Sequence, residues 1–323
     1  MRKHTFAMLV LTLTTTIFNA VVFAQVYPSK TTRIMVGAAP GGGTDVIARM
    51  LAEKFAESMQ QTFVVDNRPG ASNTIAAEIA ARAVPDGHTV LLATNTGQAI
   101  APHLLKLGFD TLRDLHPIGL ITAVPHVLLV SSQETARDVR ELVSKIKAKP
   151  GSYNYASVGI GSTQHIAAEL FNSAAGTSAA HIPYKGSSAA LIDLIAGQVQ
   201  ILLDTTSSAM PHIKSGKLRV LAITSARRSA ELPLVATMAE LGYPGVEMST
   251  WYGMYVTAGV SKPVIDKLNT ELQRALKLSD VQERLRGLGG EQNSLTLEQF
   301  VEMNRNEFER YGKLIRAANI RAD

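Results

Sequence analysis

The sequence predicts an α/β protein of two domains with a ligand cleft between them. The chain has 323 residues, a length that suggests two domains. Short β-branched runs alternate with helical patterns, and the alternation restarts in the second half, which indicates parallel sheets built from βαβ units. Two long apolar runs, Pro117–Ser131 and Met248–Ala258, flank that second half. We expect them to carry the chain into the second domain and back.

The N-terminal 24 residues have the features of a secretory signal peptide. Arg2 and Lys3 form a charged start, a mostly apolar stretch follows, and residues 22–24 form a small-x-small cleavage signal. We therefore expect cleavage after Ala24 and a mature chain in the periplasm. The alternative is an uncleaved membrane anchor, but the threonines between residues 12 and 16 make this stretch a poor membrane span.

The composition excludes several functional classes. Hydrophobic residues make up 46% of the chain, ample for buried cores but low for a polytopic membrane protein. Without Arg2 and Lys3, 30 basic residues minus 27 acidic residues leave a charge of +3, and the basic residues are scattered, so no nucleic-acid partner is expected. Without cysteine, neither disulfides nor lipid attachment through an N-terminal cysteine can form. Export separates the chain from cytoplasmic ATP and NAD, so we expect no cofactor.

In the first domain the pattern predicts alternating strands and helices. Strands are expected at Thr32–Val36, Thr62–Asp66 and Thr89–Thr94. Apolar residues from Val46 to Phe55 recur at helical spacing, and an alanine-rich helix is expected at about Thr74–Ala83. Turns at residues 67–70 and 85–87 separate these elements.

The second domain repeats this alternation after Pro125, which separates two apolar runs. Helices are expected at Arg137–Lys149, Thr163–Ser173 and Ala189–Ala196. Strands are expected at Tyr153–Ser157, Ala179–Tyr184, Val199–Asp204 and Leu218–Thr224.

The C-terminal part is predicted to be helical throughout. One helix begins near Ser261 and Pro263, and the last begins at a capping box formed by Thr296 and Gln299. We expect these helices to pack back on the first domain. Residues 25–125 and 251–323 then form domain 1, and residues 126–250 form domain 2.

Each predicted domain contains a glycine-rich turn between a strand and a helix. The first spans Pro40–Asp45 in the stretch GAAPGGGTDVIAR, and the second spans Gly159–His165. Glycine allows positive φ and close approach of the backbone, while a helix start presents unpaired N–H groups and partial positive charge. Such a turn binds an anion without lysine, and a carboxylate fits it as well as a phosphate. The residues suited to capping these helices are Thr44, Asp45, Ser162 and Thr163.

Two other interpretations of the turns must be weighed. They can be ordinary βα connections, since Gly, Ser and Thr are common there, although their presence in both halves favours binding. The first turn also resembles a nucleotide-binding phosphate loop, G-x-x-x-x-G-G-T from Gly37 to Thr44, with glycine in place of the lysine. Without lysine, ATP hydrolysis is not expected. Neither turn completes the dinucleotide pattern G-x-G-x-x-G.

Two groups of residues raise an enzyme as the alternative. His165 and Glu169 lie four apart on one predicted helix, which suits two metal ligands, but no third ligand is evident and no metal site is expected. Ser188 is the central residue of Gly186–Ala190, a stretch one glycine short of a G-x-S-x-G nucleophile elbow, and His212 and Asp193 supply the other residue types of a catalytic triad. Nothing in the sequence fixes their geometry, so no catalytic residue is expected.

Seven segments occur in an order that is found in a known family. They are PGGGTDVIAR, NRPGA, PDGHTVLLAT, YNYASVGIGSTQHIAAELF, IPYKGSSAALIDLIAGQVQILLD, MPHIKSGKLRVLAIT and WYGMYVTAGVSKPVIDKLN. In these segments, which span nearly the whole mature chain, the protein resembles the Bug family of periplasmic receptors of tripartite tricarboxylate transporters. The resemblance implies a periplasmic-binding-protein-like fold, similar to type II, with two α/β domains joined by crossing strands. It also implies a carboxylate ligand whose carboxyl group is held by the two glycine turns, often with buried waters.

The resemblance also implies which residues contact the ligand. From the two turns these are Ala38, Pro40, Gly41, Gly42, Gly43, Thr44, Asp45, Gly159, Gly161, Ser162, Thr163 and His165. From the loops that line the rest of the cleft they are Asn95, Thr96, Tyr184, Lys185, Asp204 and Thr205. Lys185 is either a solvated charge or a group on the cleft wall that attracts anions.

The chain departs from the family pattern at three places. Ala38 stands where an aromatic residue is frequent, Ser72-Asn73 replaces a pair of glycines, and Thr205–Ser208 replaces a Leu-Pro or similar pair. The expected cleft wall is therefore more polar and less aromatic, and the ligand is not identified by the resemblance.

Together these features predict a periplasmic binding protein that closes around a small carboxylate by hinge motion and delivers it to membrane transporter subunits. We expect residues 42–44 to donate hydrogen bonds from one domain and residues 161–163 from the other. A monomer is expected. The alternatives are a secreted serine or metal-dependent hydrolase, or a ligand sensor for a two-component system.

Overall fold

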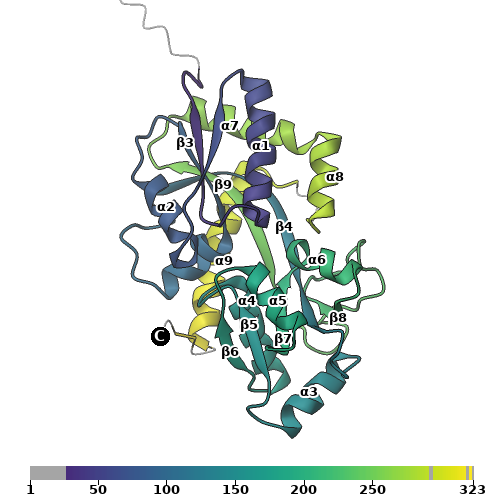
Figure 1. Ribbon diagram of the computed structural model, residues 1–323. Helices are drawn as coiled ribbons and strands as arrows, with labels where there is room; N and C mark the ends of the chain where they lie inside the picture. Colours follow the sequence, from purple (N-terminus) through teal and green to yellow (C-terminus); the bar gives the residue numbers. More distant parts are fainter. Residues whose placement is uncertain (1–26, 291–293, 318–319, 322–323) are drawn as a thin grey trace, which may run out of the picture.

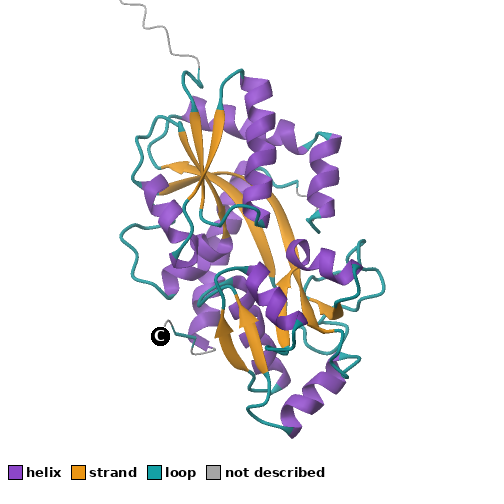
Figure 2. Cartoon of the chain, in the orientation of Figure 1, coloured by secondary structure: helices purple, strands orange, loops and turns teal. Residues whose placement is uncertain are grey.

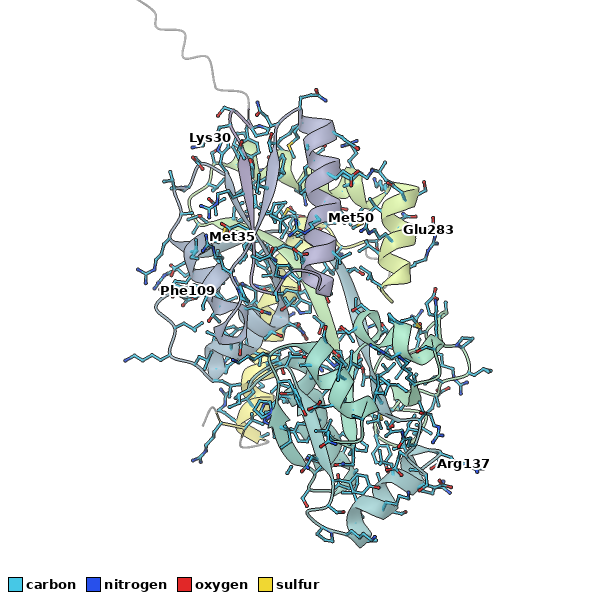
Figure 3. All side chains as sticks on the ribbon, in the orientation of Figure 1. Lys30, Met35, Met50, Phe109, Arg137 and Glu283 are labelled. Carbon is cyan, nitrogen blue, oxygen red and sulfur yellow. The ribbon has the colours of Figure 1, made fainter. Side chains whose placement is uncertain are left out.

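The protein consists of two α/β lobes that share one long strand (Figure 1). The computed structural model describes residues 27–290, 294–317 and 320–321, so the expected signal peptide lies outside the described residues. In both lobes helices flank the strands (Figure 2), and Lys30 and Arg137 lie at opposite ends of the molecule (Figure 3). This architecture confirms the predicted two-domain α/β fold.

The sheet of the first lobe contains four strands that run in one direction and one strand, between the third and the fourth of them, that runs against them. β1 (Thr32–Val36) lies between β2 (Phe63–Asn67) and β3 (Thr89–Thr94) and is parallel to both. β9 (Ser249–Thr257) pairs antiparallel with β3 on one side and with β4 (Leu115–Ser131) on the other. The bounds of β1, β2 and β3 agree within one residue with the β-branched runs of the sequence.

The sheet of the second lobe has the order β4-β7-β5-β6. β5 (Asn154–Ser157) is parallel to both β6 (Ala180–Pro183) and β7 (Ile201–Thr205). β7 and β8 (Leu218–Ile223) each pair antiparallel with β4. The strands β5, β6, β7 and β8 confirm the second alternation of strands and helices that the sequence predicts.

β4 joins the lobes as one strand of 17 residues, although Pro125 suggested two separate runs. Residues 115–125 pair with β9, whereas residues 126–131 pair with β7 and β8. Pro125 lacks a backbone N–H and sits where β4 changes partners, a position that a strand tolerates.

The return crossing is shorter than expected. The apolar run Met248–Ala258 was predicted to cross between the lobes, but β9 pairs only inside the first sheet. The chain instead crosses back at the first residues of the run, where Met248 N donates to Thr224 O at 3.2 Å. β9 is apolar because it is a central strand buried on both faces.

The helices occupy the positions at which the pattern changes from period two to period 3.6. In the first lobe they are α1 (Gly43–Met59), α2 (Thr74–Ala81), α7 (Lys262–Leu276) and α8 (Ser279–Gly287). In the second lobe they are α3 (Val139–Ala148), α4 (Thr163–Ala175), α5 (Ser187–Ile195) and α6 (Thr206–Lys214). Short helical turns are η1 (Ala71–Asn73), η2 (Thr96–Ile100) and η3 (Ala101–His103). The sequence analysis did not predict α6, which contains Pro211.

The last helix, α9 (Leu297–Ala317), begins at the predicted capping box. Thr296 N donates to Gln299 Oε1 at 2.9 Å, and Gln299 N donates to Thr296 Oγ1 at 3.3 Å. α9 packs on η2 and β4 as expected, and its C-terminal end also reaches the second lobe (Figure 1).

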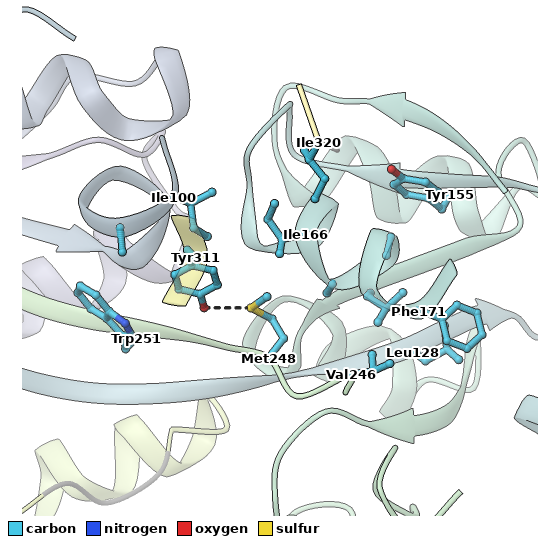
Figure 4. Packing of buried hydrophobic residues seen from close by; sticks show 14 of the residues in the cluster. Ile100, Leu128, Tyr155, Ile166, Phe171, Val246, Met248, Trp251, Tyr311 and Ile320 are labelled. Atoms are coloured by element: carbon cyan, nitrogen blue, oxygen red, sulfur yellow. Dashed lines mark hydrogen bonds between the residues drawn. The ribbon is translucent and has the colours of Figure 1, made fainter. Parts of the chain in front are cut away.

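One apolar cluster runs from the first lobe into the second. In Figure 4, Trp251 and Tyr311 lie on one side, Phe171 lies on the other, and Met248 lies between them with its sulfur accepting from the Tyr311 hydroxyl at 3.3 Å. Ile320, beyond the end of α9, belongs to the same cluster. The lobes are therefore connected by packing as well as by β4.

Candidate functional site

Three helices of the second lobe begin around one carboxylate. α4, α5 and α6 each follow one of the strands β5, β6 and β7, whose carboxyl ends lie at one edge of the sheet. Asp204 lies near the end of β7. Its Oδ1 accepts hydrogen bonds from Gln164 Nε2 at 2.8 Å, Ser187 Oγ at 3.1 Å and Thr205 N at 2.8 Å. Ligands of α/β proteins bind at such carboxyl edges.

The first lobe places the start of α1 against the same region. A Cβ atom added to Gly43 would lie 3.2 Å from the Tyr252 hydroxyl oxygen and 3.5 Å from Ser207 Oγ. Tyr252 belongs to β9, whereas Ser207 belongs to the first turn of α6. The start of α1 thus meets both lobes, and a larger residue at position 43 would press on two hydroxyl groups.

Asp45 holds the first glycine turn in shape. Its Oδ2 accepts from Gly41 N at 2.9 Å and from Arg49 Nε at 3.0 Å, and its Oδ1 accepts from Asn67 Nδ2 at 3.0 Å. Burial alone would raise the pKa of Asp45, but the hydrogen bonds from Arg49, Gly41 and Asn67 together lower it. The N-cap of α1 is Gly42, and no side chain caps this helix. The prediction that Thr44 or Asp45 would be the N-cap is therefore wrong.

The second glycine turn is held by Ser162 and His165. Ser162 is the N-cap of α4, as predicted, and its Oγ accepts from His165 N at 3.2 Å. Gly161, at φ 73°, donates its N–H to Nδ1 of His165 at 3.1 Å. The His165 ring stacks on His181 with 4.2 Å between centroids, and His181 Nε2 lies 2.6 Å from Ser157 Oγ. These contacts fix the backbone of the turn from inside the second lobe.

Each of the two turns leaves backbone donors unpaired. The N–H groups of Gly43 and Thr44 open α1, those of Thr163 and Gln164 open α4, and none has a hydrogen-bond partner among the described residues. Such groups carry the positive ends of the helix dipoles. One helix start from each lobe therefore offers a pair of donors to an anion.

Polar contacts join the lobes beside these turns. Ser72 Oγ donates to Ile160 O at 2.9 Å, which ties the segment before α2 to the second glycine turn. Thr163 Oγ1 lies 2.8 Å from Thr250 Oγ1, which lies 2.9 Å from His126 Nε2. The two glycine turns consequently lie within one region rather than at separate surfaces.

Burial changes the acidity of two groups in this region. Burial raises the pKa of Asp204, although the hydrogen bonds from Gln164, Ser187 and Thr205 oppose the rise. Burial also raises the pKa of Tyr252, and the charge of Asp204 adds to that rise. The Tyr252 hydroxyl is therefore a neutral donor at any physiological pH.

Other expected ligand residues have different surroundings. Pro40, Gly41 and Gly42 are exposed on the first turn, whereas Ala38 is half-buried and its carbonyl accepts from Asn67 Nδ2 at 3.0 Å. In the second turn Gly159 is half-buried and has a φ of 118° that favours glycine.

The three loops expected to line the cleft differ in burial. Asn95 is fully buried and donates to Ser249 O at 2.8 Å and to the Tyr311 hydroxyl at 3.0 Å, while Thr96 is buried in η2. Tyr184, half-buried, donates to Asp193 Oδ2 at 2.8 Å, and Lys185 is exposed. Thr205 is buried, and its Oγ1 accepts from Ser207 Oγ at 2.9 Å.

The residue types of the suggested enzymes are not assembled. Ser188 is exposed, and the hydrogen bonds of the described residues do not link it to His212 or Asp193. Glu169 accepts from the Tyr155 hydroxyl, and the described part of the chain holds no group of three or more potential metal-binding side chains.

Sequence reasoning missed several residues of this region. Gln164, Tyr252 and Ser187 were not proposed, because their role follows from contacts across the fold. Ser72 and Ser207 lie in two of the stretches where the chain departs from the family pattern, and that departure was the available signal.

No helix in the described ranges is both long and apolar enough to cross a membrane.

Comparisons with known proteins identify relatives along most of the chain. Residues 47–320 match the model of the "Tripartite tricarboxylate transporter family receptor". Protein BugT of Bordetella pertussis is 34% identical over 299 residues, covering 92% of each chain. Two similar solved structures are MatC from Rhodopseudomonas palustris with bound malate (30% identity, TM-score 0.84, 90% of this chain and 100% of that one) and R. palustris Rpa4515 with adipate (31% identity, TM-score 0.87, 91% and 99%).

Proposed function

Because the chain belongs to the family of tripartite tricarboxylate transporter receptors, we propose that it captures a small carboxylate between its lobes for uptake by membrane transporter subunits. The observation that carries this proposal is the pair of helix starts, one from each lobe, that offer unpaired N–H groups to one region. Gly43 and Thr44 donate to a ligand carboxylate from the first lobe, and Thr163 donates from the second, beside the Ser162 cap. The bound malate and adipate of the two solved relatives support a carboxylate ligand.

The domain limits and the location of the protein belong to the same proposal. Residues 25–125 and 251–323 form one domain and residues 126–250 the other, which the change of partners after Pro125 supports. The first 24 residues direct export and are removed after Ala24, leaving a monomeric receptor in the periplasm. The receptor binds its ligand without converting it.

A ligand screen tests the function directly. Binding to the folded state raises the melting temperature, so a thermal-shift screen over small carboxylates should yield at least one ligand, recovered unchanged after incubation. Turnover that is lost in Ser188→Ala or His165→Ala would instead establish an enzyme.

A substitution at Gly43 tests whether the start of α1 binds the ligand carboxylate. Gly43→Val should abolish the ligand-induced shift while the protein still unfolds cooperatively, because the added Cβ would lie 3.2 Å from the Tyr252 hydroxyl and its methyl groups would fill the space in front of the α1 donors. The matched control is Gly245→Val, since a Cβ there meets no atom within 4 Å and the backbone has an ordinary φ. If the ligand raises the melting temperature of Gly43→Val as much as that of the wild type, the start of α1 does not bind the carboxylate.

A further inference from the structure

One oxygen of a buried carboxylate is left without a partner at the proposed site. Asp204 is fully buried, and its Oδ1 accepts three hydrogen bonds. Oδ2 is also buried and has no hydrogen-bond partner in the part of the chain that the structure describes. Buried polar atoms are nearly always paired, so an unpaired carboxylate oxygen needs an explanation.

Asp204 lies near the two helix starts that are proposed to bind the ligand carboxylate. Gln164, whose amide donates to Asp204, is a residue of the first turn of α4, and its backbone N–H is one of the unpaired donors. On the other side Thr205, whose N–H donates to Asp204, accepts through its Oγ1 from Ser207 Oγ, which lies 3.5 Å from the position of a Cβ atom on Gly43 at the start of α1. Short series of contacts therefore lead from Asp204 to both helix starts.

The surroundings of Asp204 determine which chemical group can face Oδ2. Among the described residues, no lysine, arginine or histidine forms a salt bridge with Asp204. A second carboxylate placed against an ionised Oδ2 would bring two negative charges together in a buried place, at high energetic cost. A hydroxyl or an ammonium group would instead supply the missing hydrogen bond, and an ammonium would also neutralise the charge.

Resting on the proposed function, we propose that Asp204 selects carboxylic acids that carry a hydroxyl or ammonium group close to the carboxyl group. The helix starts of α1 and α4 bind the ligand carboxylate, and Oδ2 of Asp204 accepts from the neighbouring donor. The two groups must be close in the ligand because Asp204 is so close to the α4 start. Asp204 is therefore a specificity residue that distinguishes hydroxy and amino acids from plain acids.

Matched acids test this selectivity in the wild-type protein. Calorimetric titrations would use succinate, malate and aspartate, then glutarate, 2-hydroxyglutarate and glutamate, then propionate, lactate and alanine. Within each set the carbon chain is constant and the group beside the carboxyl group changes. We expect at least one set in which the hydroxy or amino acid binds ten times more tightly than the plain acid, or better.

Substitution of Asp204 tests the assignment of that selectivity. In Asp204→Asn the preference should fall to threefold or less, because an amide group facing the ligand no longer offers an anionic acceptor, while the plain acid binds as in the wild type. Asp266→Asn is the control, since this carboxylate is exposed on α7 and pairs with Lys262, and it should keep the preference. If Asp204→Asn fails to fold, the pH dependence of the preference in the wild-type protein decides the assignment.

The pH dependence separates the proposal from the opposite arrangement. Burial raises the pKa of Asp204, and a hydrogen-bond donor in the ligand favours its ionised form, so affinity for the hydroxy or amino acid should rise with pH. If a protonated Asp204 donated to the ligand carboxylate instead, plain acids would bind equally well and more weakly as pH rises, which would overturn the inference. Equal affinities for all the acids within every set would also overturn the inference about Asp204, while the proposed binding of carboxylates would stand. If no carboxylate binds at all, the proposed function fails first.

Discussion

At the scale of single residues, Asp45 acts on the shape of the binding turn. Its carboxylate receives three hydrogen bonds, from Gly41 in the turn, Arg49 in α1 and Asn67 at the end of β2. These bonds join the loop to the helix and to the strand beside it. The exposed glycines of the turn have few other contacts, so the turn owes much of its order to this one side chain.

Asp45→Asn should destabilise the protein by about 1–3 kcal/mol at pH 7, the usual cost of leaving buried hydrogen-bonding groups unpaired. The hydrogen bonds hold the pKa of Asp45 below its unfolded value of about 3.9, so its contribution is complete above that value and disappears as pH falls through the folded pKa. Urea unfolding at pH 7 and pH 3 measures the difference between wild type and variant, which should shrink at pH 3.

The control for Asp45 is another aspartate with an arginine or lysine four residues away on a helix. Asp266→Asn removes the ion pair between Asp266 and Lys262, two side chains that are both largely exposed. The free energy of unfolding should therefore change by less than about 0.5 kcal/mol. An Asp45→Asn variant as stable as this control would show that the turn does not depend on the carboxylate.

The residues that act within one turn could be predicted, whereas those that act across the fold could not. Ser162 was expected to cap α4 because a serine between a glycine turn and an apolar helix has a local role. Tyr252 lies more than 200 residues after Gly43, and their contact depends on the pairing of β9 with β3. No local pattern contains that information.

At the scale of elements, the sequence analysis predicted the strands of both sheets but not how two of them are used. A proline inside a run usually ends a strand. β4 nevertheless continues through Pro125, because its partner strands change at that residue. α6 was missed because Thr206–Lys214 contains Pro211 and several serines and threonines, which have low helix propensity. Its contacts with β4, β7 and β8 outweigh that propensity.

Two helix caps allow stability and binding to be separated. Ser162→Ala and Thr296→Ala should each cost about 1 kcal/mol in urea unfolding, because each removes the oxygen that accepts from a backbone N–H at a helix start. Ser162→Ala alone should also weaken carboxylate binding, since α4 supplies donors to the proposed site and α9 does not. Ser162→Thr and Thr296→Ser should behave like the wild type. Equal effects of both alanine variants on affinity would argue that the α4 start has no role in binding.

At the scale of the whole molecule, the lobes are joined firmly at one end and by few polar contacts at the other. β4, α9 and the apolar cluster that includes Met248 and Tyr311 connect them behind the site. At the glycine turns, hydrogen bonds such as Ser72 to Ile160 hold them together. A ligand that contacts both turns favours this arrangement by the free energy of those contacts, and opening releases it.

The hydrogen bond from Ser72 Oγ to Ile160 O should therefore control ligand release more than folding. Its net value is about 1 kcal/mol, so Ser72→Ala should increase the dissociation rate of a bound carboxylate about fivefold in stopped-flow experiments. The free energy of unfolding should change little, because the bond joins surfaces that separate when the lobes open. Ser152→Ala is the matched control, since Ser152 Oγ donates to a carbonyl within the second lobe, that of Lys149. If both variants release ligand at the wild-type rate, the contact between the turns does not keep the ligand in place, and closure depends on the ligand alone.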